Sequence, residues 1–379
     1  MIKTVEYELL ETVAPVDRVV FGDVWSMPDD PAVRLELVRH AVELHIATCP
    51  KYARFAARAG FSVENLRDPA DLASVPQLPT LAFKLGDPIM SCALHDVAMR
   101  CTSSGTLGRR SEVYRDRPTI ERLLGSVRSG IELIGDWYDD EVGVVNLGPD
   151  QSEAGDLWFA YVMSLIELVY PTVHAVRDGR FDPEEALATV DALCRRYPNA
   201  VLIGPPALVF DLVQTARRAQ RDISALSGLF VVTAGGWKRS TGTVLDRDEF
   251  NTTVLDGFGL ADVTQIRDAF NQVELNTVML ECGAQRKHVP PWLEVIIRDP
   301  WTLEPVAPGA QGLISYLDPT ATSYPCFIVG DDVGTVDNGP CPCGWHGRTL
   351  RHARRVQRDE EWGCAIKMDR DYTVEGNGR

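Results

Sequence analysis

The sequence contains no run of roughly 18 consecutive apolar residues, the length that a helix needs to cross a membrane, so we expect no membrane span. The N-terminal segment MIKTVEYELLETVAPVD carries several acids and no apolar run, so we expect no signal peptide. The nine cysteines have irregular spacing, and in a chain without an export signal they are not expected to form disulfides. Together these features predict a cytoplasmic protein.

Basic residues are scarce relative to acidic ones. The chain has 38 Lys and Arg against 54 Asp and Glu, a formal net charge of −16 at pH 7. Nucleic acids and anionic membranes are both bound through basic faces, so neither is an expected partner. Hydrophobic residues make up 45% and charged residues 24% of the 379 residues, which is typical of a globular protein.

After a helical region that extends to about Ala98, strand-like and helix-like segments alternate as far as Gly259. Asp182 as a cap and Pro183 at the first helical position predict one helix start. Three short apolar runs each end in a loop that contains glycine: Val142–Val145 before NLGPD, Val201–Ile203 before IGPP, and Leu229–Thr233 before TAGGW. This order predicts an α/β fold with a parallel sheet and ligands at the carboxyl ends of its strands. Beyond Pro290 the strings WLEVIIRD, GLISYLD and FIVGDDVGTV predict further strands.

A loop of hydroxyls and glycines, TSSGTLG, runs from Thr102 to Gly108. Its amides and side chains are suited to surround phosphate oxygens. It is not a Walker loop, because Arg109, Arg110 and Ser111 follow it in place of Gly-Lys-Ser/Thr. An ordinary surface turn is the alternative for this string taken alone.

Glu274 in FNQVE and Asp331 in GDD are weaker candidates when taken alone, because single acids of this kind usually lie on surfaces and turns. Their order along the chain changes this interpretation. The hydroxyl loop, a glycine loop, an aromatic segment with a glutamate and a strand ending in Gly-Asp resemble, in that order, the motifs of the adenylate-forming superfamily.

That resemblance implies that the loop holds the phosphates of ATP, that Glu274 reaches Mg²⁺ and that Asp331 binds the ribose. It also implies a glycine pair near the adenine and a glutamine near the acyl-adenylate. The nucleotide-binding residues are therefore expected to be Thr102, Ser103, Ser104, Gly105, Thr106, Gly108, Gly235, Gly236, Gln272 and Asp331.

Longer strings are similar to the acyl-protein synthetases of bacterial fatty-acid reductase complexes, the LuxE family. They include RDRPTIERLLGSV, GDWYDDEVGVVNLGPD, QIRDAFNQVELNT and SYPCFIVGDDVG, and they extend from about Pro76 to the end. The resemblance implies the large-domain α/β fold of adenylate-forming enzymes with the C-terminal lid domain reduced. It divides the chain into a helix-rich N-terminal part (1–100), an α/β core (101–339) and a reduced C-terminal segment (340–379).

The resemblance also implies two reactions. A fatty acid reacts with ATP to give acyl-AMP and pyrophosphate, and the acyl group then passes to a cysteine near the C-terminus and on to a partner reductase. The matching cysteine here is Cys364, which lies among arginines, a setting that favours the reactive thiolate. Cys364 and Glu274 are therefore the catalytic candidates, and a buried apolar cysteine is the alternative for Cys364.

Four other residues, Cys282, His288, Cys341 and Cys343, depart from the pattern of the luminous bacteria and resemble the zinc cluster of phenylacetate–CoA ligase-like relatives. Three thiolates and one imidazole are typical of structural zinc. Free cysteines on a turn are the alternative, and His346 is the reserve ligand.

The final acyl acceptor stays open at this stage, since coenzyme A, a carrier protein or a nitrogen nucleophile would suit a divergent member. A non-catalytic subunit of a reductase complex is a further alternative. The sequence also leaves open the identity of the acid and whether the chain forms a homo-oligomer.

Overall fold

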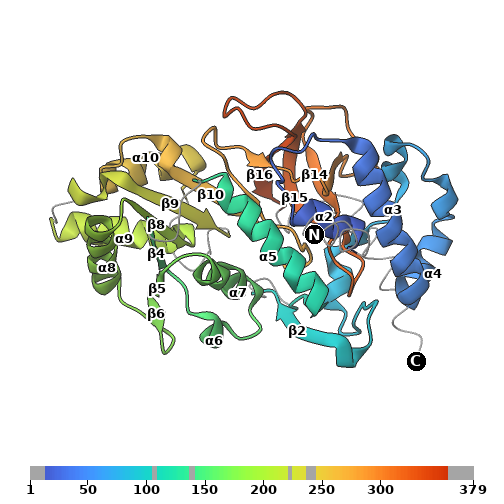
Figure 1. The fold of residues 1–379 in the computed structure, drawn as a ribbon, viewed down its shortest axis with the longest axis horizontal. Coiled ribbons are helices and arrows are strands. Elements are labelled where there is room, and N and C mark those ends of the chain that lie inside the picture. The colour runs from blue at the N-terminus through green and yellow to red at the C-terminus, as the bar shows by residue number, and fades with distance from the viewer. Residues whose placement is uncertain (1–12, 105–108, 136–140, 221–223, 236–244, 357–379) are drawn as a thin grey trace, which may run out of the picture. The chain divides into compact units, whose positions relative to one another are not determined.

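The computed structural model describes residues 13–104, 109–135, 141–220, 224–235 and 245–356 (Figure 1). The chain divides into two compact units. The first unit comprises Met1–Ser129, Gln272–Thr277 and His288–Arg379, and the second comprises Gly130–Asn271 and Val278–Lys287. Among the helices in the described ranges, none is both long and apolar enough to cross a membrane.

The second unit is built on a mainly parallel sheet in the order β11-β10-β9-β8-β4-β5. Strands β5, β4, β8, β9 and β10 run parallel, and β11 is antiparallel to β10. The strand bounds are β4 (Val142–Asn146), β5 (Thr172–His174), β8 (Asn199–Gly204), β9 (Leu229–Ala234), β10 (Ile266–Phe270) and β11 (Met279–Leu280); β6 (Val176–Arg177) and β7 (Arg180–Phe181) form a separate hairpin. This arrangement confirms the predicted α/β sheet.

Helices of the second unit start where local sequence signals favour a start. Asp182 caps α8 (Pro183–Arg196) by accepting from the amides of Glu184 and Glu185, as predicted. Asp246 and Glu249 form a capping box at the start of α10 (Arg247–Phe258), and Gly259 ends that helix in the left-handed conformation. The other helices of this unit are α6 (Gln151–Ala154), α7 (Trp158–Ser164) and α9 (Pro206–Arg218).

One apolar core joins α8, α9 and α10 to one face of this sheet, and Figure 1 shows α8 and α9 beside β4 and β8. Burial of these side chains contributes about 25 cal/mol per Å² of apolar surface removed from water, which makes the sheet a rigid support for the loops at its ends. The core is formed by Val145, Leu187, Val190, Leu202, Val209, Leu212, Val213, Leu229, Val231, Phe250, Val254, Phe258 and Ile266, among others.

The first unit contains a second, mainly antiparallel sheet in the order β12-β16-β15-β14-β13, with β1 pairing in parallel with β15. The strands are β1 (Leu78–Pro79), β12 (Lys287–His288), β13 (Glu294–Arg298), β14 (Gly312–Leu317), β15 (Phe327–Asp337) and β16 (Thr349–Arg355). Strands β13, β14 and β15 match the three strands predicted beyond Pro290. Strand β16 lies in the segment 340–379, for which the sequence analysis predicted no strand.

Helices α3 (Pro31–Thr48) and α4 (Pro50–Arg58) pack on this sheet. The rings of His45 and Tyr52 lie 5.5 and 5.6 Å from the ring of Phe327 at the start of β15. The remaining elements of the unit are α2 (Pro15–Val20), the hairpin β2 (Val97–Thr102) and β3 (Glu112–Asp116), and most of α5 (Arg117–Glu132).

Candidate nucleotide site

The predicted phosphate loop begins at the tip of the β2–β3 hairpin. Thr102, the last residue of β2, pairs with Glu112 in β3 and is buried. Beyond this pair, the amide of Ser103 donates to the carbonyl of Ser111 over 3.0 Å, and the amide of Ser111 donates to the hydroxyl of Ser103 over 2.9 Å. The hairpin therefore fixes both ends of the loop that contains Ser104. Gly105, Thr106 and Gly108 lie outside the described residues.

Asp331 lies on β15, directly after Gly330. The parallel pairing of Leu78 and Pro79 with Ile328 and Val329 places the 3₁₀ helix η3 (Thr80–Lys84) next to this aspartate. The hydroxyl of Thr80 donates to Asp331 Oδ2 over 2.9 Å. Two cations also approach that oxygen, Lys84 Nζ at 3.9 Å and Arg355 Nη2 at 3.5 Å. The carboxylate is therefore oriented by a hydrogen bond and has positive charge around it.

Glu274 belongs to the same unit, because residues Gln272–Thr277 pack with it although the flanking segments belong to the second unit. Its side chain is buried, and burial raises its pKa above the usual 4.5. The nearby Ser111 side chain and the positive charge of Lys84 oppose this shift, whereas the charge of Asp331 adds to it. These interactions bring the phosphate-loop hairpin, Glu274 and Asp331 together in one site of the first unit.

A buried arginine holds the backbone on either side of Glu274. Arg115, on β3, has no exposed surface, and its Nη2 donates to the carbonyl of Val273 over 2.6 Å. Its Nε donates to Asn276 Oδ1 over 3.1 Å. The hydroxyl of Tyr324 donates to the carbonyl of Glu274 itself over 3.2 Å. Since buried hydrogen bonds to a charged group are each worth roughly 1.5–3 kcal/mol, the Glu274 segment has little freedom to move.

Two further predicted residues lie beside strand ends. Gln272 Nε2 is buried without a hydrogen-bond partner among the described residues, and a Cβ built on Gly330 would lie 3.6 Å from it. In the second unit, Gly235 follows β9 with φ +74°, a conformation that favours glycine, and a Cβ there would lie 2.9 Å from Phe159 Cε2. Gly236 lies outside the described residues, as does Cys364.

Comparison with known proteins identifies the family. A model of the family described as "Acyl-protein synthetase, LuxE" matches residues 3–373. The chain belongs to the LuxE family. It is 38% identical over 385 residues to a long-chain-fatty-acid–luciferin-component ligase of Vibrio harveyi, covering 100% of this chain and 99% of that protein. The corresponding ligase of Aliivibrio fischeri is 38% identical over 368 residues, with 96% of each chain covered.

The fold of this LuxE-family chain is that of adenylate-forming ligases. A crystal structure of 2-hydroxyisobutyryl-CoA ligase in an open conformation, in complex with 2-HIB-AMP and CoA, superposes with a TM-score of 0.68 at 15% identity. The match covers 86% of this chain and 75% of that one. The predicted fold class is thereby confirmed.

Two residues of the LuxE-family site were not predicted from the sequence, Thr80 and Lys84. Both come from η3, about 190 residues before Glu274 and 250 before Asp331. The string PTLAFK that contains them has no hydroxyl–glycine pattern and no acid, so it carries no signal of nucleotide binding. Only the pairing of β1 with β15 brings them to Asp331.

Three of the four predicted metal ligands lie together in the first unit. The ligand atoms of His288, Cys341 and Cys343 lie within 4.8 Å of one another. His288 Nε2 is 3.2 Å from Cys343 Sγ, and His288 Nδ1 is 3.2 Å from the carbonyl oxygen of His346. A proton on Nδ1 would donate to that carbonyl and leave the Nε2 lone pair directed at the sulfur atoms. His346 therefore takes part through its backbone.

Cys282, the fourth predicted ligand, belongs to the second unit, six residues before His288. Its amide donates to the carbonyl of Arg286, and Glu281 bridges to Lys287. This turn folds the chain back on itself, so that Cys282 lies near Lys287, the residue that precedes His288. The buried guanidinium of Arg267, in the same unit, interacts electrostatically with Cys282.

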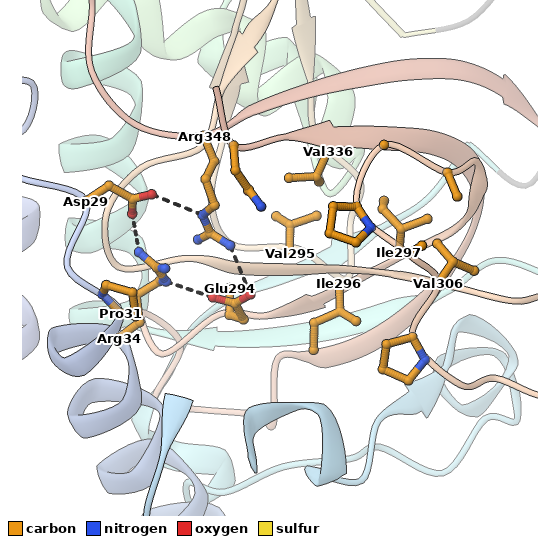
Figure 2. Close-up of a pocket in the computed structure, with 16 residues that line it drawn as sticks. Asp29, Pro31, Arg34, Glu294, Val295, Ile296, Ile297, Val306, Val336 and Arg348 are labelled. Atoms are coloured by element: carbon orange, nitrogen blue, oxygen red, sulfur yellow. Dashed lines mark hydrogen bonds and ion pairs between the residues drawn. The ribbon is translucent and has the colours of Figure 1, made fainter. Parts of the chain in front are cut away.

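A pocket of about 410 Å³ in the first unit is lined by four alternating charges and an apolar floor (Figure 2). Arg34 pairs with Asp29 and, over 2.7 Å, with Glu294; Arg348 pairs with Glu294 over 2.9 Å and with Asp29 over 3.3 Å. Two cations and two anions cancel, so this ring has no charge left for a ligand. Its evident effect is to anchor Arg348, which follows the turn that carries Cys341 and Cys343.

Proposed function

We propose that this chain activates a long-chain fatty acid with ATP as acyl-AMP and then carries the acyl group as a thioester on Cys364 for a partner reductase. The observation that supports this most strongly is the convergence of the β2–β3 hairpin, Glu274 and Asp331 in one site of a LuxE-family chain. The names of the relatives from Vibrio harveyi and Aliivibrio fischeri point to the same acid.

In the first reaction, a carboxylate oxygen of the acid attacks the α-phosphorus of ATP, and the bond between that phosphorus and the bridging oxygen to the β-phosphate breaks. Pyrophosphate leaves. The carboxylate of Asp331, oriented by Thr80, is suited to accept hydrogen bonds from the ribose hydroxyls. The hydroxyls and amides at Thr102, Ser103 and Ser104 are suited to the phosphate oxygens.

Magnesium fits the residues present at Glu274. Burial disfavours the charged form of Glu274 and raises its pKa, so a divalent cation that neutralises this carboxylate would be bound favourably there. When bound there, Mg²⁺ would neutralise charge on the departing pyrophosphate. The unpartnered amide of Gln272 beside Gly330 is likewise suited to donate a hydrogen bond to the adenylate.

In the second reaction, the thiolate of Cys364 attacks the acyl carbonyl, the bond to the phosphate oxygen breaks, and AMP leaves. The thioester keeps the acyl group activated for the reductase. A second candidate acceptor is coenzyme A, a carrier protein or a nitrogen nucleophile, and the Cys/His cluster, a departure from the pattern of the luminous bacteria, is the observation in its favour.

Pyrophosphate release should be measured across a panel of fatty acids of increasing chain length and of aromatic acids. We expect acid-dependent release with a maximum among the long-chain acids and no stimulation by coenzyme A. A maximum with an aromatic acid, or strong stimulation by coenzyme A, would favour the second candidate. No release with any acid would leave the chain as a non-catalytic subunit.

We also propose that His288, Cys341, Cys343 and Cys282 bind a structural zinc ion. Three thiolates and one imidazole form a closed tetrahedral set, and the carbonyl of His346 is suited to fix the histidine tautomer. The positive charge of Arg267 near Cys282 suits a site whose net charge would be −1. Within the first unit, zinc would tie His288 to the turn between β15 and β16.

Purified protein is therefore expected to contain about one zinc per chain by mass spectrometry of the metal. Cys341→Ser should reduce the content several-fold and lower the Tm, because zinc that binds only the folded state stabilises it. Cys92→Ser is the control, since this half-buried cysteine of the same unit is not in the cluster. Wild-type protein with well under one zinc per chain would refute the metal site.

A further inference from the structure

We infer that Lys84 is the residue that binds the α-phosphate, the group at which acyl-AMP forms. This inference rests on the proposed adenylation and adds to it a residue that neither the motifs nor the family resemblance indicates. It depends on the position of Lys84 between the two acids of the site, on its partial exposure and on the chemistry of an ammonium group.

Lys84 is positioned by η3, a short helix that a hydrogen bond from Thr80 ties to Asp331. Thr80 and Lys84 are the first and last residues of η3, and both side chains approach the same oxygen, Asp331 Oδ2. Thr80 is buried and hydrogen-bonded to Asp331 Oδ2 over 2.9 Å. Lys84 Nζ lies 3.9 Å from that same oxygen. The threonine anchors the helix, and the lysine contacts the carboxylate only loosely.

Lys84 acts on Glu274 as well as on Asp331. Its charge favours the ionised form of Glu274, whereas the charge of Asp331 opposes it. The ammonium thus lies within electrostatic reach of both carboxylates. Its side chain is 25% exposed, so the group is accessible to a ligand. Arg355 also approaches Asp331, but its side chain is 58% exposed, so solvent screens its charge more strongly.

The order of the ribose and phosphate groups in ATP then indicates which group Lys84 would contact. With the ribose hydroxyls at Asp331 and the metal-bound β- and γ-phosphates at Glu274, the groups between them are the 5′-oxygen and the α-phosphate. A lysine ammonium is a compact point charge with three donors and is well suited to a phosphate oxygen. As the carboxylate attacks, negative charge grows on the α-phosphate oxygens, and a fixed ammonium stabilises it without donating its proton.

A comparison of adenosine and AMP binding distinguishes a contact with the α-phosphate from a role of Lys84 in neutralising Asp331 alone. Both ligands place a ribose at Asp331, but only AMP carries the α-phosphate. For Lys84→Met we expect the Kd of AMP, measured by calorimetry, to rise about 10- to 100-fold, as for loss of one charge-assisted hydrogen bond. The Kd of adenosine should change less than about threefold, and Lys84→Arg should retain part of the AMP affinity.

The two half-reactions supply the second measurement. Acid-dependent ATP–pyrophosphate exchange by Lys84→Met should fall about 100-fold, whereas acylation of the protein at saturating synthetic acyl-AMP should fall less than about threefold, because no new charge builds on the phosphorus in that step. The concentration of acyl-AMP needed for half-saturation should rise together with the Kd of AMP. Arg355→Gln is the matched comparison, because it removes a cation from the same oxygen. It should leave the ratio of AMP to adenosine affinity unchanged.

If Lys84→Met weakens the binding of adenosine and of AMP equally, Lys84 only neutralises Asp331 and the inference is overturned. The same holds if Arg355→Gln lowers the AMP affinity as much as Lys84→Met does. Unchanged AMP affinity in a folded Lys84→Met protein would overturn it as well, while leaving adenylation intact. Wild-type protein that binds neither ligand and releases no pyrophosphate would overturn the proposed function itself.

Discussion

Replacing Cys364 by alanine is expected to abolish covalent labelling by radioactive fatty acid and ATP, while acid-dependent pyrophosphate release continues. The thioester needs a sulfur nucleophile, whereas acyl-AMP forms before that nucleophile takes part. Labelling is measured on denatured protein after gel electrophoresis, and neutral hydroxylamine should remove the label from wild-type protein, since it cleaves thioesters.

Cys194→Ala is the matched control for this experiment. Cys194 lies on α8, and burial raises the pKa of its thiol to about 11, so the group stays protonated and unreactive near neutral pH. This variant should be labelled as strongly as the wild type. Persistent labelling of Cys364→Ala would assign the acyl group to another residue and remove Cys364 from the mechanism.

Replacing Glu274 by glutamine is expected to lower the rate of pyrophosphate release by about 10²- to 10³-fold, because a neutral amide of the same shape cannot hold a divalent cation at the phosphates. Binding of adenosine should be nearly unchanged, since the ribose is assigned to Asp331. Glu121→Gln is the control, because Glu121 forms an exposed pair with Arg117 on the surface of α5.

The raised pKa of Glu274 gives this prediction a dependence on pH. Below that pKa the carboxyl is neutral, and above it the carboxylate is available to the metal. The apparent affinity for Mg²⁺ in the presence of an ATP analogue should therefore rise with pH through this range in wild-type protein. The contribution of the protonated group to stability has the opposite dependence: it is complete below the usual 4.5 and is lost as pH rises through the raised pKa. A Glu274→Gln protein with the same pH profile as the wild type would show that another group controls it.

Local signals in the sequence account for much of the fold. Asp182 and Pro183 specify the start of α8, and the apolar runs before glycine loops became β4, β8 and β9. Each of these elements is decided by residues a few positions apart. Strand β16, TLRHARR, was not predicted because it lacks the alternation of apolar and polar residues that marks a half-buried strand. Beyond its first two residues, its side chains are exposed or half-buried, as in a polar tail.

The part of the site that could not be predicted depends on pairing between distant segments. Leu78 and Pro79 form only a two-residue strand, yet their pairing with β15 brings Thr80 and Lys84 to Asp331. The role of Arg115 could not be predicted from the sequence either, because an arginine in a strand usually faces solvent. In the structure it donates a hydrogen bond to the carbonyl of Val273.

The last described residue has a consequence for the fate of the acyl group. The amide of Val356 donates to the carbonyl of Asp331 over 2.8 Å, so the chain leaves the sheet beside the residue assigned to the ribose. Cys364 follows eight residues later, and eight residues span at most about 29 Å in any conformation. If Cys364 accepts the acyl group as proposed, this chain length alone limits its distance from Val356 and corresponds to an effective concentration on the order of millimolar. Free thiols would have to reach similar concentrations to intercept the acyl group before Cys364 does.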